Sequence, residues 1–326
     1  MRLSLVIPVH DDTPGLTRLL EQVPRLGVFA QVIVVDDASP APCTPAALGI
    51  GARDLGLEGD ALVSLRLSAR RGAGHARNRG FEQVTGSHVL FFDADDLLTD
   101  ALAGLVTALE GQEFDFAIFR HGESRMRAQG RAAPMPYDEI YWNAVPQPLG
   151  VLAPAQAAML CRISAYPWNK IYRSDFLRAH AIGCTEIAVH NDIELHWLSF
   201  LHARRILAAR TVCAEHIVRP AMPGGAHLTH RRGAERLEVF AALRPVLAAL
   251  HDPAHRRYLV PFLDFCLRLG DWIEGVLDPA LRPAFDARMR AFLREDLCEP
   301  LFRLVALDAP ALAVRLNARM DGEGRV

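Results

Sequence analysis

Residues 88–96 read HVLFFDADD, a mostly apolar run that ends in three carboxylates. The run is typical of a buried strand, and its acidic residues stand where that strand would end. A second apolar run, Gln31–Val35, ends in the same way in Asp36 and Asp37. One acidic strand end could be only a helix cap, but clustered carboxylates are costly unless they are compensated. Two such ends in one sheet predict a Mg²⁺ or Mn²⁺ site that shares phosphate oxygens.

Strands and helices alternate on both sides of this stretch. Apolar runs predict strands at Leu3–Val9, Gln31–Val35, Leu62–Leu67, His88–Phe92 and Phe114–Phe119, and helical spacing predicts helices at Pro14–Leu26, Ala76–Val84 and Ala101–Glu110. This alternation predicts an α/β fold with a mostly parallel sheet flanked by helices. In such sheets, ligands bind at the carboxyl ends of the strands.

The second half of the chain has a different character. Residues 125–165 show little periodicity, and we expect loops and short helices there, followed by regular structure at Tyr166–Ala179 and Asn191–His202. From Gly233 onward only helical periodicity remains. We therefore predict two parts, an α/β domain at 1–230 and an all-helical C-terminal region at 231–326.

Composition limits the class of protein. The 326 residues are 51% hydrophobic and 23% charged, with a formal net charge of -2, so we expect a folded protein without a nucleic-acid partner. The six cysteines form no C-x-x-C pair, which is typical of reduced thiols in a cytoplasmic protein. No secretory signal is evident, and no apolar run approaches the ~18 residues of a membrane span. At most, we expect contact with a membrane surface.

A basic stretch with three glycines leads into the second predicted helix, Ala76–Val84. Residues 70–80 read RRGAGHARNRG, and their backbone N–H groups and arginines would suit a diphosphate. A dinucleotide-binding fingerprint would require glycine where Arg77 stands. The alternative is a tight turn with a solvated basic helix face.

Three further features carry chemistry. Asp192 begins a predicted helix, where the helix dipole keeps a carboxylate ionised, so it is a candidate general base as well as a simple cap. Lys170 is the only lysine, so any mechanism that needs a lysine must use it. Residues 224–232, GGAHLTHRR, are a candidate phosphate lid. Whether His227 and His230 touch phosphate or metal stays open, and zinc would need a third ligand.

Together these features resemble the family 2 glycosyltransferases of the GT-A fold, as found in bacteria. The matching segments are Val6–Asp11, Val34–Pro40, Gly74–Gly80, Phe92–Asp96 and Pro167–Arg173. The last of these resembles a segment common in bacterial members, and Phe92–Asp96 resembles the family's D-x-D motif. Asn191 stands where the family usually has Glu, directly before Asp192. The order and spacing of the motifs make the resemblance specific over about residues 1–230.

The resemblance implies a role for each matching residue. Asp192 is the general base, and Asp95 is the metal ligand next to the diphosphate, with Asp93 shared between metal and ribose. Asp96 is expected to be structural. The nucleobase would lie against Pro8, Val9, His10 and Asp11, and Asp37 would accept a hydrogen bond from it. Arg77 would lie near the nucleotide, and Lys170 would lie beside Trp168 at the sugar or acceptor.

The implied activity is inverting, hexosyltransferase-like transfer from a nucleotide-diphosphate sugar, with a UDP-sugar favoured, to an acceptor hydroxyl. Surface polysaccharide, lipid-linked glycan and protein all stay open as acceptors, with surface polysaccharide or glycan synthesis favoured, in the cytoplasm or at the inner face of the cell membrane. The C-terminal helices match no family and would pack on the catalytic part or form a homodimer.

Two rival interpretations remain. A HAD-type phosphohydrolase would use Asp93 as its nucleophile, but that motif normally opens the fold, whereas three predicted strands precede it here. Leu97 stands where that family has Thr or Val, and its lysine could only be Lys170. A non-catalytic module that binds sugar nucleotides is the second rival, because Asn191 departs from the family pattern.

Overall fold

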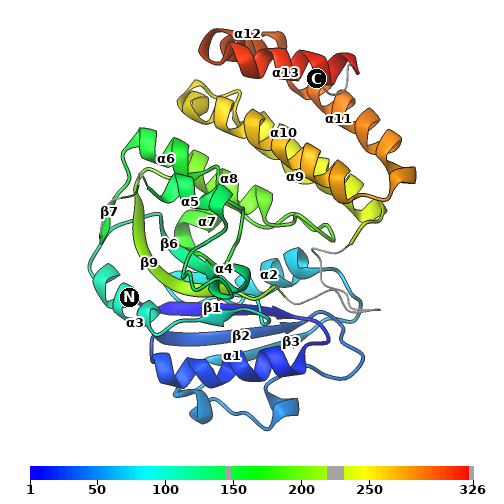
Figure 1. Ribbon diagram of the computed structural model, residues 1–326. Helices are drawn as coiled ribbons and strands as arrows, with labels where there is room; N and C mark the ends of the chain where they lie inside the picture. The colour runs from blue at the N-terminus through cyan, green and yellow to red at the C-terminus, as the bar shows by residue number, and fades with distance from the viewer. Residues whose placement is uncertain (144, 146–147, 219–230, 323–326) are drawn as a thin grey trace.

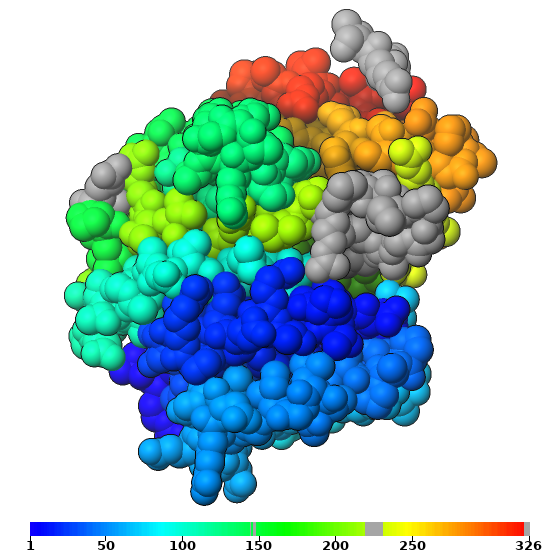
Figure 2. Space-filling model, turned by 60° about the horizontal axis from the view of Figure 1, so that its bottom comes forward, coloured from blue at the N-terminus to red at the C-terminus, as the bar shows by residue number. Residues whose placement is uncertain are grey.

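A computed structural model describes residues 1–143, 145, 148–218 and 231–322. His227 and His230, with most of the predicted phosphate lid, lie outside the described residues. Figure 1 shows the α/β part at the bottom and centre and the C-terminal helices above it. In the space-filling view of Figure 2, the N-terminal residues form one end, the C-terminal helices form the other, and the middle of the chain lies between them.

The described strands form one sheet of nine strands. They are β1 (Leu3–Val9), β2 (Phe29–Asp36), β3 (Leu62–Arg66), β4 (His88–Phe91), β5 (Leu97–Leu98), β6 (Phe116–Glu123), β7 (Leu149–Val151), β8 (Lys170–Arg173) and β9 (Ile206–His216). Their order is β3-β2-β1-β4-β8-β6-β9-β5, and β7 pairs with β9. The five predicted strands are confirmed as β1, β2, β3, β4 and β6. The other four had not been predicted.

The predicted α/β fold is confirmed, but the sheet is mixed rather than mostly parallel. β3, β2, β1 and β4 run parallel. β8 lies between β4 and β6 and runs antiparallel to both. β9 is parallel to β6 but antiparallel to β5 and β7. An apolar run predicts a strand without its direction, because direction depends on the connection that leads into the strand.

Helices cover both faces of the sheet. Within the α/β part they are α1 (Thr13–Leu26), α2 (Ala73–Phe81), α3 (Ala101–Leu109), α4 (Ser124–Arg127), α5 (Pro136–Trp142), α6 (Pro154–Leu160), α7 (Ser174–Ala179) and α8 (Ile193–His202). In β1, Leu5 and Ile7 face the cluster that contains α1 and α3, and Val6 faces the cluster that contains α2 and α8. This alternation, with every residue of β1 buried, is the pattern of a sheet that is covered on both sides.

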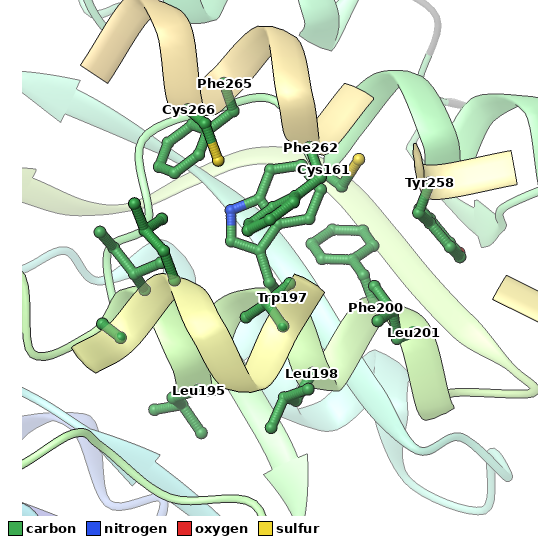
Figure 3. Packing of buried hydrophobic residues seen from close by; sticks show 14 of the residues in the cluster. Cys161, Leu195, Trp197, Leu198, Phe200, Leu201, Tyr258, Phe262, Phe265 and Cys266 are labelled. Atoms are coloured by element: carbon green, nitrogen blue, oxygen red, sulfur yellow. The ribbon is translucent and has the colours of Figure 1, made fainter. Parts of the chain in front are cut away.

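The C-terminal region is helical, as predicted. Its helices are α9 (Val239–Ala249), α10 (Leu259–Val276), α11 (Arg282–Asp296), α12 (Glu299–Asp308) and α13 (Pro310–Asp321). Its buried residues join those of the α/β part in one apolar cluster. At this junction, the ring centroid of Trp197 on α8 lies 5.1 Å from that of Phe262 and 5.3 Å from that of Phe265, both on α10 (Figure 3).

The boundary at residue 230 falls between β9, the last described strand, and Ala234, where regular helical structure resumes. We keep 1–230 and 231–326 as a proposed division into two parts that share a core. None of the described helices combines the length and the apolar character needed to cross a bilayer.

Candidate functional site

A cavity of about 570 Å³ lies where β4 ends and α8 begins. Its walls come from segments far apart in the sequence. Arg77 comes from α2, Asp93 and Asp95 follow β4, and Asp192 precedes α8. Trp272 on α10 belongs to the C-terminal region. The acidic end of β4 therefore faces a cavity that the C-terminal helices help to build.

The three carboxylates after β4 form a compact group. Asp93, Asp95 and Asp96 each offer an oxygen, and these oxygens lie within 4.8 Å of one another. Burial, followed by the charges of Asp96 and Asp93, raises the pKa of Asp95 to about 7. A divalent cation would relieve this repulsion, and carboxylate oxygens are the ligands that Mg²⁺ and Mn²⁺ prefer. The donor set therefore fits such a metal.

The Asp96 carboxylate is bound by groups at the end of β9. Its Oδ1 accepts a hydrogen bond from the backbone N–H of Ile217 at 2.8 Å and lies 3.0 Å from Nδ1 of His216. Burial disfavours the charged imidazole, but the Asp96 carboxylate outweighs burial and raises the pKa of His216 to about 9. The side chain thus ties the loop after β4 to the end of β9, in agreement with the structural role expected for Asp96.

Arg77 joins the acidic loop after β4 to the segment that carries Asp192. One end of its guanidinium donates to Asp93 Oδ1 at 2.5 Å and the other to Asn191 Oδ1 at 2.7 Å. Although burial opposes the charge, the Asp93 carboxylate raises the pKa of Arg77 above its usual value. Arg77 therefore stays charged and fixes Asp93 relative to the residue before Asp192.

The glycine pattern before Arg77 has a packing reason. A Cβ at Gly74 would lie 2.4 Å from the backbone oxygen of Thr185 and 2.8 Å from Cβ of Asn191. Only glycine lets α2 approach the 185–191 segment this closely. This approach brings the Arg77 guanidinium within hydrogen-bonding distance of Asn191.

Asp192 occupies the N-cap position of α8 and lines the cavity. Burial raises the pKa of its carboxyl to about 6, even though Arg77 and Lys170 act in the opposite direction. A carboxylate with a pKa near 6 is ionised at neutral pH and still basic enough to accept a proton from a hydroxyl group in a transition state.

The residues expected around the nucleobase gather at the ends of β1 and β2. Pro8 and Val9 pair in register with Val35 and Asp36, and His10 Nδ1 lies 2.8 Å from the backbone oxygen of Asp37. Asp11 has a φ of 51°. Asp37 shares this region with Pro8, Val9, His10 and Asp11, and none of these residues lines the 570 Å³ cavity.

The Asp37 carboxylate is engaged by the basic glycine turn. It accepts hydrogen bonds from the backbone N–H groups of Arg71 and Gly72, each at 2.7 Å. Gly72 has a φ of 91°, which favours glycine. Asp37 therefore holds the turn that leads into α2. A hydrogen bond from the nucleobase to Asp37 would have to use the remaining lone pairs of this carboxylate.

Lys170 lies outside the lining of the cavity. It is fully buried. Its Nζ donates to the backbone oxygen of Tyr166 and to Asn169 Oδ1, each at 2.7 Å. Burial lowers its pKa to about 7, against the effect of Asp192 and Asp138. Its expected place beside the sugar or acceptor stays a prediction, and the neighbouring Trp168 lines the cavity.

Several cavity residues were missed by the sequence analysis. These residues are Tyr137, Arg162, His216, Arg236, Arg268 and Trp272. Tyr137 and Arg162 lie in the aperiodic middle, and the last three lie on helices with no recognisable motif. Their local sequence carries no signal of a site, since the fold alone brings them to Asp192.

Comparisons with known proteins identify a family and a fold. The family described as Glycosyl transferase family 2 matches residues 4–165, about half of the chain. The uncharacterized glycosyltransferase EpsJ of Bacillus subtilis is 24% identical over 206 residues, which cover 63% of this chain and 57% of EpsJ.

Solved structures share the fold over nearly the whole chain. TarS 1–349 of S. aureus, solved in complex with UDP-GlcNAc, has a TM-score of 0.74 at 18% identity, covering 98% of this chain and 88% of that one. The mannosyltransferase PcManGT of Pyrobaculum calidifontis, solved with GDP-Man and Mn²⁺, has a TM-score of 0.55 at 18% identity, with 99% and 88% covered. At such identities the likeness shows the fold alone.

The mixed sheet with helices on both faces has the GT-A fold that these structures share. The chain belongs to glycosyltransferase family 2. The HAD-type alternative is thereby set aside. Lys170, the lysine that it would need, is buried and bonded to Tyr166 and Asn169.

Proposed function

We propose that this protein transfers a sugar from a UDP-sugar to a hydroxyl group of a saccharide acceptor, with inversion at the anomeric carbon. The observation that carries the proposal is the position of Arg77. This side chain holds Asp93 of the acidic cluster and Asn191 beside Asp192, so the metal-binding group and the candidate base face one cavity.

The donor would extend from the residues at the ends of β1 and β2 to the acidic cluster after β4. The nucleobase would lie against Pro8, Val9, His10 and Asp11, close to Asp37. The family assignment and the UDP-GlcNAc bound by TarS support a uridine nucleotide.

Asp95 and Asp93 would hold Mn²⁺ or Mg²⁺. The Mn²⁺ bound by PcManGT supports this choice. When bound, the metal would neutralise the negative charge that grows on the leaving diphosphate. Arg77 holds the Asp93 carboxylate in place, and Asp96 anchors the loop through Ile217, so the cluster is organised before the donor arrives.

Asp192 would activate the acceptor. Its carboxylate takes the proton from the acceptor hydroxyl while that oxygen forms a bond to the anomeric carbon. The bond between the anomeric carbon and the diphosphate oxygen breaks, and its electron pair leaves with the nucleoside diphosphate. A single displacement of this kind inverts the anomeric centre, and it requires the base and the leaving group to lie on opposite sides of the sugar.

The biological setting proposed is the synthesis of a surface polysaccharide or another glycan, on a glycan or lipid-linked acceptor. The site of action would be cytoplasmic, at the inner face of the cell membrane, and the protein would act as a monomer or a homodimer.

The decisive experiment separates donor binding from turnover. UDP and GDP are compared for thermal stabilisation of the protein with and without Mn²⁺, because a bound ligand at 100 times its Kd stabilises the folded state by about 2.7 kcal/mol. Transfer from UDP-GlcNAc and UDP-glucose is then followed across an acceptor panel. Stabilisation by UDP together with transfer supports the proposal. UDP binding without turnover would support the non-catalytic alternative, and no stabilisation by either nucleotide would refute both.

A further inference from the structure

We propose that α10 supplies the acceptor subsite, and that the subsite takes a saccharide carrying a negatively charged group. This inference rests on the proposed function and adds a substrate class to it. Trp272 would stack against the sugar ring, and Arg162 and Arg268 would bind the anionic group.

Trp272 is placed as a platform. It lines the cavity and is 43% exposed, whereas the other three tryptophans are at most 1% exposed. The carbon at the centre of the Arg236 guanidinium lies 4.7 Å from the Trp272 ring centroid, and the ring of His190 meets it edge-on at 5.8 Å. These contacts hold the indole in place. A fixed aromatic face suits the C–H face of a sugar, whose partial positive charges meet the negative π surface.

The contact with His190 places the platform beside the candidate base. His190 lies two residues before Asp192 and adopts a φ of 62°, a conformation that few residues other than glycine take. Its Nε2 lies 3.0 Å from the Arg236 guanidinium. An acceptor stacked on Trp272 therefore lies next to the segment that positions Asp192. The 49% exposed Tyr137 lines the same cavity and provides a second aromatic surface.

The charge of this side of the cavity favours an anion. Among the described residues, and apart from Arg77, the acidic cluster, Asp192 and His216, the charged residues that line it are four arginines and one aspartate: Arg125, Arg162, Arg236, Arg268 and Asp138. Asp138 accepts from the backbone N–H of Ser164 at 2.8 Å, and burial raises its pKa to about 6.

Arg162 and Arg268 are only partly neutralised within the protein. Both pair with Asp264, at 4.0 and 3.1 Å, and Arg315 pairs with the same carboxylate at 3.1 Å. One carboxylate thus serves three guanidinium groups. The Nε of Arg162 is buried and has no hydrogen-bond partner among the described residues. Guanidinium groups bind carboxylate and phosphate through paired N–H donors, so a ligand anion would complete this cluster.

The test uses three methyl glycosides as probes: methyl glucoside, methyl glucuronide and methyl glucoside 6-phosphate. Their affinities for the full chain loaded with UDP and Mn²⁺ are measured by calorimetry. We expect at least one anionic probe to bind about tenfold more tightly than the neutral one. The glucuronide and the phosphate separate a carboxylate ligand from a phosphate ligand. Equal affinities for all three probes, or no binding by any, would overturn the proposal.

Variants locate the interaction. Trp272→Ala and Arg268→Gln should each weaken anionic-probe binding about tenfold, and Trp272→Phe should restore part of it. Arg315→Gln is the matched control, because Arg315 pairs with the same Asp264 but does not line the cavity. A similar loss in Arg315→Gln, or unchanged binding in Trp272→Ala, would refute the subsite.

UDP affinity measured in the same samples keeps this proposal separate from the proposed function. If the wild type binds UDP but Trp272→Ala binds the probes normally, only the subsite fails. If the wild type does not bind UDP, the proposed function fails. A parallel loss of UDP affinity in Trp272→Ala would place Trp272 on the donor side and overturn the subsite.

Discussion

The side-chain oxygen of Asn191 accepts a hydrogen bond from Arg77 at 2.7 Å. The same guanidinium also holds Asp93, so a neutral amide and one carboxylate share it. The family usually has Glu at this position, which would bring a second carboxylate to the arginine. Because Asn191 is neutral, the positive charge of Arg77 is compensated by the carboxylates of Asp93 and the nearby Asp192.

Removing the arginine should loosen both segments. We expect Arg77→Gln to lower the free energy of unfolding by about 1–3 kcal/mol, because it leaves buried partners without their donor. Urea unfolding measures the change. Arg79→Gln, on the same helix but half exposed and paired only with Glu82 among the described residues, is the control and should change little. Equal stability of the two variants would contradict the bridging role of Arg77.

Gly74 tests the close packing of α2. Gly74→Ala should destabilise the protein by about 1–3 kcal/mol and reduce transfer, because the added methyl group meets the backbone oxygen of Thr185. In α3, Gly104 has no atom near an added Cβ, so Gly104→Ala should be neutral or stabilising by about 0.5–1 kcal/mol. Thermal unfolding and transfer assays compare the pair. A stable, active Gly74→Ala variant would show that residues 185–191 can shift to admit the methyl group, and it would contradict a need for glycine at position 74.

The pH dependence of transfer should report Asp192. A general base works only when it is deprotonated, and burial raises the pKa of this carboxyl to about 6. At saturating Mn²⁺, kcat/KM should therefore stay level above about pH 6 and fall about tenfold per pH unit below it. Asp192→Asn should lose transfer while it keeps UDP binding. A profile that stays flat down to pH 4.5, or an active Asp192→Asn variant, would eliminate Asp192 as the base.

The metal dependence of transfer and of UDP binding should distinguish the proposed metal ligand Asp95 from an acidic residue outside the site. EDTA should abolish transfer, and added Mn²⁺ should restore it in the wild type. In Asp95→Asn, Mn²⁺ should no longer add to the stabilisation by UDP, because a charged ligand is missing. Asp175→Asn, an exposed substitution on α7, serves as the control. Full metal dependence in Asp95→Asn would remove Asp95 from the ligand set.

The shared core predicts that the two parts of the chain unfold together. Phe262→Ala should cost about 3–5 kcal/mol, because Phe262 is fully buried against Trp197 of α8. Val314→Ala, at a position exposed on α13, should have almost no effect. Calorimetry should show a single transition in both variants. Two resolved transitions would support independent folding of 1–230 and 231–326.

The local sequence was sufficient for the elements whose pattern is complete within a few residues. β1 runs from Leu3 to Val9 as predicted, because every residue in it is apolar or enclosed and Asp11 and Asp12 mark the end of the run. β9 was missed although it is the longest described strand. Its residues 206–216 mix arginine, threonine and glutamate with alanine, and only its pairing with β6 defines it as a strand.

By itself, the sequence determined the α/β class, the helical C-terminal region and the acidic strand end at Asp93 and Asp95, since these depend on local periodicity and on residue type. The tertiary structure decided which groups meet. It placed Trp272 beside His190, buried Lys170 away from the cavity and tied Asp96 to Ile217. These relationships join residues tens to more than a hundred positions apart. No local pattern encodes them, because they arise only when the elements pack around a common core.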